Sequence, residues 1–239
     1  MLLALHMLAL GVITVVFFGM IVLHRRARVR QQTARAGDSL SLTDPKCTLH
    51  PVVWLAIRSS SPKAVQAALG MNYPARCPWM EGISGEHEFF IGAPVNKWII
   101  VTGSSLPHPD HDVDRCFHFL LRLSRVLGHV QLFMADPILQ HHAWVQVENG
   151  NVKRAYAWTG KTVWNQGPRS LAETELNLKC FGYGEEKDGK AAMEENVAAN
   201  VKKVPSLAAR WSIDPMAMDG NLQTHADGIA GKSSLFCQD

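Results

Sequence analysis

The chain has 239 residues, of which 47% are hydrophobic and 19% are charged, and its formal net charge at neutral pH is +3. This composition is typical of a globular protein and excludes a collagen-like or wholly disordered chain. Its five cysteines include no CxxC pair and are too few for the disulfide framework of a small secreted domain. The length suits one folded domain with an appendage.

The first 23 residues form one apolar run, which a histidine, a threonine and two glycines interrupt. At about 1.5 Å per helical residue the run reaches about 34 Å, enough for a bilayer core of about 30 Å. A cleaved signal peptide is the alternative, but this run has no basic segment before it and exceeds the usual length of such a core. The sequence therefore predicts a single transmembrane helix over residues 1–23.

Positive charge is concentrated directly after this run. Five of the 24 basic residues and no acidic residue lie in 1–36, so 37–239 carries 19 basic against 21 acidic residues, a net charge of −2. By the positive-inside rule, we expect the N-terminus outside and the body in the cytoplasm. The residues that predict this orientation are Arg25, Arg26, Arg28 and Arg30. The slightly acidic body gives no reason to expect a nucleic-acid partner.

Hydrophobic patterning divides the rest of the chain. Residues 24–50 are first basic and then small and polar, which is typical of a juxtamembrane segment followed by a linker. Residues 51–215 alternate strand-like and helix-like patterns, so we expect an α+β domain with a mainly antiparallel sheet and packed helices. From 216 to 239 the residues are mostly small and polar, which predicts a flexible tail.

Individual elements follow from local patterns in this domain. Short β-branched and aromatic runs predict strands over 52–59, 87–93, 97–103 and 129–135. Ser61-Pro62 and Gly70 frame a short helix, and apolar residues at a 3.6-residue period predict a longer one over 111–127. Further helices are expected over 171–178 and near 187–203.

Asn149-Gly150 lies between two alternating runs and is the strongest short-range hairpin signal in the chain. A two-residue loop there predicts four facing pairs: Val147 with Val152, Val145 with Arg154, Ala143 with Tyr156 and His141 with Trp158. Adjacent strand residues point to opposite faces, so His141 and His142 are not expected to bind one metal ion together.

The block of residues 107–114 is the most site-like stretch. His108, Asp110 and His111 are potential metal ligands, and their spacing is similar to part of the HxHxDH signature of metallo-hydrolases, with Leu106 at the position of the first histidine. A metal-dependent hydrolase that uses this cluster is therefore one hypothesis. The commoner explanation of such a block is a solvated loop whose acids cap the following helix.

Cys77 is a second candidate, as a thiolate assisted by Arg76 with a histidine elsewhere as base. A lone buried thiol is the commoner interpretation. Two segments with a Gly-Lys-Thr or Gly-Lys-Ser ending lack the strand and helix that a phosphate-binding loop needs, so we do not expect a nucleotide site. No other catalytic motif is present, which argues against an enzyme and predicts no cofactor.

The main hypothesis is a protein-binding module of immunity or scaffolding type, tethered to the membrane and exposed to the cytoplasm. It rests on the expected anchor, the missing catalytic signature and seven tryptophans, because Trp, Tyr and Arg are enriched at protein interfaces. The candidate contact residues are Trp144, Trp158, Tyr156 and Arg154.

Three strings carry a resemblance to known sequences: PVNKWIIVTG, DVDRCFHFLLRLSRVLGHVQLF and HHAWVQVENGNVKRAYAW. They make residues 52–184 similar to an uncharacterised family of bacterial proteins. No activity is attached to that family, so the resemblance implies no catalytic residue. It does imply that the expected membrane is the bacterial inner membrane.

Overall fold

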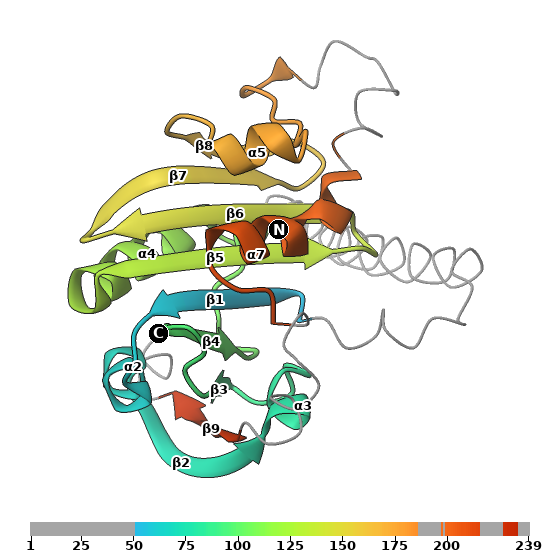
Figure 1. Cartoon of the computed structure of the whole chain (residues 1–239). Coiled ribbons are helices and arrows are strands. Elements are labelled where there is room, and N and C mark those ends of the chain that lie inside the picture. The colour runs from blue at the N-terminus through green and yellow to red at the C-terminus, as the bar shows by residue number, and fades with distance from the viewer. Residues whose placement is uncertain (1–50, 186–196, 198, 216–226, 234–239) are drawn as a thin grey trace, which may run out of the picture. The chain divides into compact units, whose positions relative to one another are not determined.

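The computed structural model describes residues 51–185, 197, 199–215 and 227–233. The chain divides into two compact units, Met1–Pro45 and Lys46–Asp239, and all described residues belong to the second. They form a nine-stranded sheet with the strand order β2-β9-β3-β4-β1-β5-β6-β7-β8 (Figure 1). Every pairing between neighbouring strands is antiparallel.

The strands are β1 (Val53–Arg58), β2 (Met71–Pro78), β3 (Phe89–Ile91), β4 (Trp98–Thr102), β5 (His129–Asp136), β6 (His141–Glu148), β7 (Asn151–Trp158), β8 (Thr162–Gln166) and β9 (Asp227–Ser233). The helices are α2 (Pro62–Leu69), α3 (Trp79–Gly82), α4 (Val113–Leu127), α5 (Leu171–Glu175) and α7 (Val204–Trp211), together with the 3-10 helix η2 (Ala199–Lys203). The two helices predicted after Ser61 and over 111–127 are confirmed as α2 and α4.

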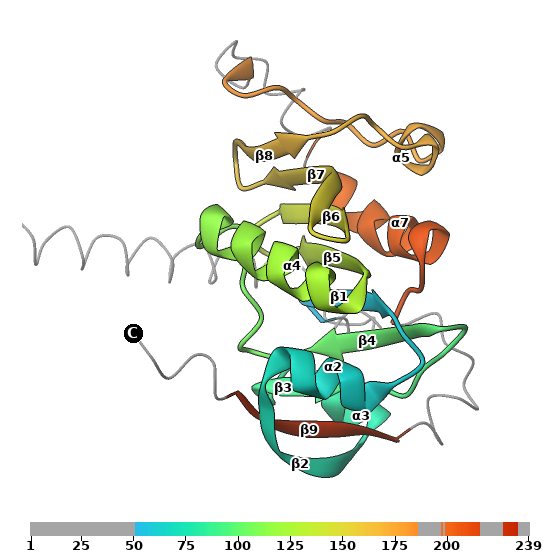
Figure 2. The same cartoon turned by 90° about the vertical axis from the view of Figure 1, so that its left-hand side faces the viewer.

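Both faces of the sheet are covered, so its central strands are apolar on both sides. In β1, Leu55 and Ile57 pack against one face while Trp54 and Ala56 pack against the other. Helices α2 and α4 cover the first face, and α3 and α7 cover the second (Figure 2). The continuous apolar run over 52–59 therefore reflects burial on two faces.

The predicted fold class is corrected by the structure. The described residues form an antiparallel nine-stranded sheet with few helices, in place of the α+β domain with a transmembrane helix. In the described part of the chain, no helix is long and apolar enough to cross a membrane. The longest, α4, has 15 residues and spans about 22 Å, which is shorter than a bilayer core of about 30 Å.

This finding also corrects the predictions that depended on a membrane helix. They are the single-pass anchor, the bacterial inner-membrane location with a cytoplasmic body, and the orientation assigned to Arg25, Arg26, Arg28 and Arg30. The predicted span 1–23 and the segment 24–50 lie outside the described residues. The apolar run over residues 1–23 and the arginines that follow it were the basis of these predictions.

The predicted hairpin is present as β6 and β7, but most of its register is wrong. Val147 pairs with Val152 as expected, whereas Gln146 pairs with Arg154, so Lys153 is an extra residue in β7. Beyond this bulge every partner shifts by one. Trp144 therefore lies opposite Tyr156, and both side chains point to the same face of the sheet.

The C-terminal strand was missed because its composition is that of a loop. Residues 227–233, inside the segment expected to be a tail, form β9 between β2 and β3. Small residues are needed there, since a Cβ on Gly228 would lie 2.4 Å from the carbonyl oxygen of Ile91. A Cβ on Gly231 would lie 2.6 Å from the carbonyl oxygen of Asn72. The helix expected near 187–203 lies largely outside the described residues.

Candidate functional site

The loop between β4 and α4 brings three potential metal ligands together. The backbone N–H groups of His111 and Asp112 both donate to the carbonyl oxygen of His108, which folds the loop into a tight turn. The imidazole rings of His108 and His111 stack with centroids 5.2 Å apart. One ligand atom from each of His108, Asp110 and His111 lies within 4.8 Å of the others. The residues nominated from sequence therefore converge.

Asp110 is the centre of this cluster. Its carboxylate is 9% exposed, and its Oδ2 lies 3.3 Å from Nδ1 of His141. Its Oδ1 lies 3.7 Å from Nδ1 of His108, and among the described residues no donor makes a hydrogen bond to this buried oxygen. A buried carboxylate oxygen without a donor is costly, and a bound cation removes that cost.

The protonation states of the cluster suit metal binding. Burial lowers the pKa of His108, and the opposing effect of Asp110 does not reverse this, so the imidazole stays neutral near pH 7. Burial acts to raise the pKa of Asp110, but the hydrogen bond from His141 and the nearby imidazoles outweigh it and keep the pKa below its usual value. A neutral imidazole and an ionised carboxylate are the forms that bind metal ions.

His141 joins the site from a distant part of the sequence. It is the first residue of β6, and its contact with Asp110 spans 31 positions. His142 points to the opposite face and is fully buried, in agreement with the expectation that these neighbours do not share one ion. Only the tertiary fold places His141 here, so no local pattern in the sequence could have identified it.

A hollow of about 280 Å³ opens beside the cluster. It is lined by Ser104, Ser105, Leu106, Pro107, His108, His111, Asp112 and Arg115. A second hollow of about 300 Å³ shares Ser104 and His108 with it. Water and a small ligand can therefore reach His108 and His111.

Backbone contacts fix the start of this loop. The N–H of Ser104 donates to the carbonyl oxygen of His87 at 2.9 Å, and the N–H of Ser105 donates to that of Glu88 at 3.1 Å. Gly103 has a φ of 138°, and a Cβ there would lie 2.3 Å from the carbonyl oxygen of Glu88. Only glycine permits this close approach of the two backbones.

The four residues nominated for protein binding are all buried. Trp144 and Tyr156 are fully enclosed, and Trp158 and Arg154 are 3% and 2% exposed. Glu173 of α5 accepts from Nε1 of Trp144 at 2.8 Å and pairs with Nε of Arg154 at 2.9 Å. These side chains hold α5 against β6 and β7, and none of the four offers a surface to a partner in this structure.

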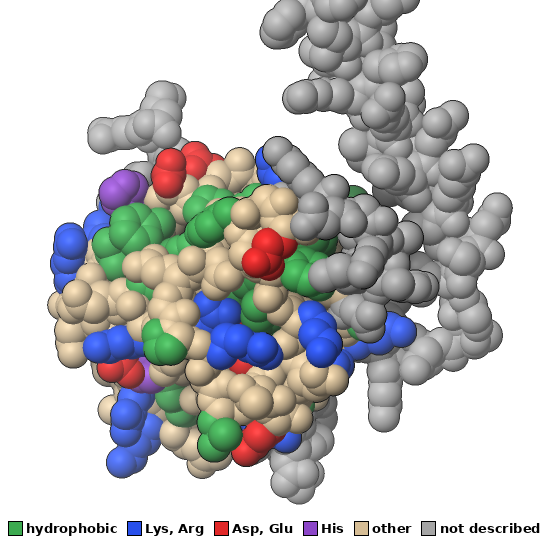
Figure 3. Space-filling view, turned by 90° about the horizontal axis from the view of Figure 1, so that it is seen from above, with side chains coloured by type: hydrophobic (Ala, Val, Ile, Leu, Met, Phe, Trp, Pro, Cys, Tyr) green, Lys and Arg blue, Asp and Glu red, His purple; other side chains and the backbone are tan. Residues whose placement is uncertain are grey.

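Large exposed hydrophobic side chains are dispersed over several elements, among them Tyr73, Val126, Leu171 and Tyr183. On the face seen in Figure 3, hydrophobic side chains lie in small groups separated by Lys and Arg. A protein interface usually presents one contiguous apolar patch. The prediction of a protein partner therefore stays a prediction without an assigned surface.

Comparison with known proteins adds no assignment. No protein-family model matches the chain, and neither the curated proteins nor the solved structures include a significant match. The resemblance of residues 52–184 to an uncharacterised bacterial family stays a prediction. Function must therefore be inferred from the geometry of the site.

Proposed function

We propose that this protein binds a divalent transition-metal ion through His108, Asp110 and His111 and uses it to activate water for hydrolysis. The observation that carries the proposal is the buried Oδ1 of Asp110, which lacks a hydrogen-bond donor among the described residues and lies 3.7 Å from Nδ1 of His108, in a cluster that also holds His111. A solvated loop whose acids cap α4 explains Asp112, which accepts from the N–H of Arg115. It does not explain why Oδ1 of Asp110 is buried without a donor.

The donor set supports an ion of the zinc class. Two imidazole nitrogens and one carboxylate oxygen are ligands that zinc and neighbouring transition metals accept in hydrolytic enzymes. Three protein ligands leave a fourth position open, and the hollow of about 280 Å³ lies on the side of His108 and His111. When bound, such an ion lowers the pKa of a coordinated water towards about 7 and so supplies a nucleophile.

His141 acts as a positioning residue in this proposal. Its Nδ1 contacts Oδ2 of Asp110, which leaves Oδ1 aimed towards His108. Hydrogen bonds to the far side of a ligating carboxylate commonly fix its orientation and raise metal affinity by about 10–100-fold. His141→Ala is therefore expected to weaken metal binding by about that factor without removing a ligand.

Calorimetric titration of the full-length protein with Zn²⁺ tests the proposal. The wild-type chain should show a tight binding event that Asp110→Asn loses, because the amide lacks the charge that neutralises the ion. His118→Gln is the matched control, since this histidine lies exposed on α4 and contacts Phe117 rather than the cluster. Equal Zn²⁺ binding by the wild-type chain and Asp110→Asn would refute the metal site.

Hydrolysis is tested separately on the zinc-loaded protein. A panel of chromogenic carboxylic esters, phosphate esters and amides should contain at least one class that the wild-type chain cleaves and Asp110→Asn does not. Cleavage that persists in Asp110→Asn, or no cleavage of any class by protein shown to hold zinc, rejects the hydrolytic part of the proposal.

A further inference from the structure

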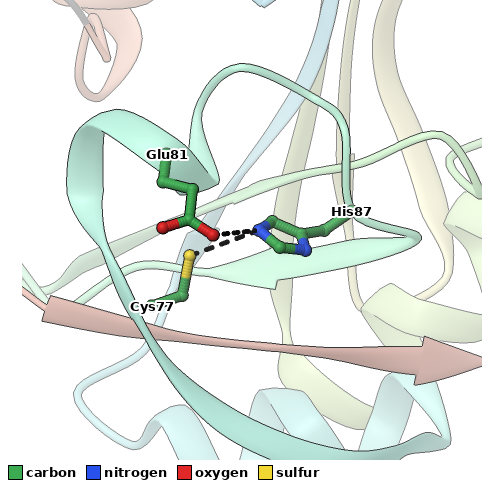
Figure 4. A group of neighbouring side chains, drawn as sticks. All are labelled: Cys77, Glu81 and His87. Carbon is green, nitrogen blue, oxygen red and sulfur yellow. Dashed lines mark hydrogen bonds and ion pairs between the residues drawn. The ribbon is translucent and has the colours of Figure 1, made fainter.

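A second group of potential ligands lies along the stretch of chain from the end of β2 to the start of β3. Cys77 comes from the end of β2, Glu81 from α3, and His87 from the loop before β3 (Figure 4). Sγ of Cys77 lies 3.4 Å from Nε2 of His87, and Oε1 of Glu81 lies 3.3 Å from the same nitrogen. One ligand atom of each residue lies within 4.8 Å of the other two.

This arrangement does not suit a nucleophilic thiol with a histidine base. In such a site the thiol contacts one ring nitrogen, and a third group orients the ring through the other nitrogen. Here Cys77 and Glu81 both approach Nε2 of His87, as Figure 4 shows. Burial, followed by the charges of Glu81 and Asp227, also raises the pKa of Cys77 to about 11. The thiol stays protonated at neutral pH unless a cation replaces its proton.

Two of the three separations between ligand atoms match the edges of a coordination tetrahedron. With zinc–sulfur bonds of about 2.3 Å and zinc–nitrogen and zinc–oxygen bonds of about 2.0 Å, tetrahedral angles place sulfur about 3.5 Å from nitrogen. The same geometry places nitrogen about 3.3 Å from oxygen. The observed separations of 3.4 Å and 3.3 Å agree with both values. The third pair, Sγ of Cys77 and a carboxylate oxygen of Glu81, lies within 4.8 Å, so the three side chains are close enough to approach one ion.

The surroundings leave room for a fourth ligand. A hollow of about 430 Å³ is lined by Cys77, Glu81 and His87 together with neighbours that include Arg76 and Tyr73. Arg76 is paired with Asp227, so its charge is already balanced. The peptide carbonyl of His87 accepts from the backbone N–H of Ser104, which holds the loop that carries this ligand.

We propose that Cys77, Glu81 and His87 form a second metal site, which takes a divalent ion of the zinc class with water in the fourth position. Binding exchanges the thiol proton for the ion: the S–H bond breaks, a sulfur–metal bond forms, and one proton is released to solvent. A thiolate, an imidazole and a carboxylate together favour zinc or cobalt over magnesium or calcium, which prefer oxygen ligands alone. The bound ion ties β2, α3 and the loop before β3 together.

Cobalt(II) provides a readout specific to this site. A thiolate bound to Co²⁺ gives an intense near-ultraviolet charge-transfer band, which the His–Asp–His cluster cannot produce because it has no sulfur. We expect the full-length protein to develop this band on addition of Co²⁺ and to lose it on addition of excess Zn²⁺. In Asp110→Asn, which lacks the first site, about one proton should be released for each ion bound, in weakly buffered solution near pH 7.

Matched variants separate this site from the first. Cys77→Ser should abolish the band, whereas Cys116→Ala should keep it, because Cys116 is a buried thiol of α4 outside any ligand cluster of the described residues. Asp110→Asn should also keep the band, so the two metal proposals can fail independently. Glu81→Gln should weaken cobalt binding. Because this side chain is exposed, the substitution should change the free energy of unfolding little. A wild-type chain without the band, or a band that survives Cys77→Ser, overturns the proposal.

Discussion

His142 is buried as a neutral imidazole. Its Nε2 lies 3.3 Å from Nδ2 of Asn200, whose amide is oriented by Lys179: Oδ1 accepts from the Lys179 N–H and Nδ2 donates to its carbonyl oxygen. The remaining amide hydrogen therefore points at Nε2, which must act as an acceptor. Burial lowers the pKa of His142 to about 3, with a smaller contribution from His141, and the backbone of Gln140 opposes this only in part.

The folded protein should consequently lose stability as the pH falls below about 6.5. In the unfolded chain an imidazole has a pKa of about 6.5, so between that value and the folded value only the unfolded chain binds the proton. The contribution of His142 to the free energy of unfolding is therefore complete above about pH 6.5. It declines by about 1.36 kcal/mol for each pH unit below that value. At about pH 5, His142 alone should have removed about 2 kcal/mol from the free energy of unfolding.

The substitution His142→Gln tests this value, because glutamine offers an acceptor to Asn200 and does not titrate. Urea unfolding followed by tryptophan fluorescence at about pH 7 and about pH 5 gives the free energy of unfolding at each pH. The wild-type chain should lose about 2 kcal/mol more than His142→Gln between the two. Burial also lowers the pKa of His108 and His129, but their contributions are common to both proteins and cancel. Equal losses in the two proteins would refute the reasoning, and His118→Gln should behave as the wild type.

Three further substitutions test two ion pairs and one close backbone approach by the same urea measurement. Glu173→Ala leaves the charge of Arg154 buried and unpaired, so the free energy of unfolding should fall by about 3–5 kcal/mol. Glu175→Ala is the control: it removes only an exposed ion pair with Arg210 and should lower the free energy of unfolding by less than about 1 kcal/mol. If Glu173→Ala and Glu175→Ala lowered it equally, the role assigned to burial would be contradicted. Gly92→Ala places a Cβ 2.4 Å from the ring of Trp79 and should cost about 1–3 kcal/mol, whereas an unchanged midpoint would show that the ring moves freely.

Short sequence motifs correctly predicted the helices α2 and α4, because residues at the helix ends determine where these helices begin and end. Ser61 caps α2, and Gly70 ends it with a φ of 62°. Asp112 accepts from the N–H of Arg115 and begins α4. The strand β2 was missed because only Met71 and Cys77 of its eight residues are buried, so no alternation marks it.

Features that depend on tertiary contacts were predicted poorly. The extra residue Lys153 shifts the hairpin register, and its effect was to bring Trp144 and Tyr156 together on one face. In the same way, sequence spacing found His108, Asp110 and His111 because a single turn joins them, but it could not supply His141 from β6. Cys77, Glu81 and His87 lie within eleven positions of one another, so a search for mixed Cys, Glu and His ligands would have found them.

The backbone contact between residues 103–105 and 87–88 links the two proposed ions. His87 is a ligand of one site, while Ser104, which donates to its carbonyl oxygen, lines the hollow beside the other. Any displacement of His87 by a bound ion would be transmitted through this contact to the start of the loop that carries His108, and a displacement of the loop would be transmitted back to His87. Under the two proposals the sites are thermodynamically coupled. If an ion at one site changes the affinity of the second site by some factor, an ion at the second site changes the affinity of the first by the same factor.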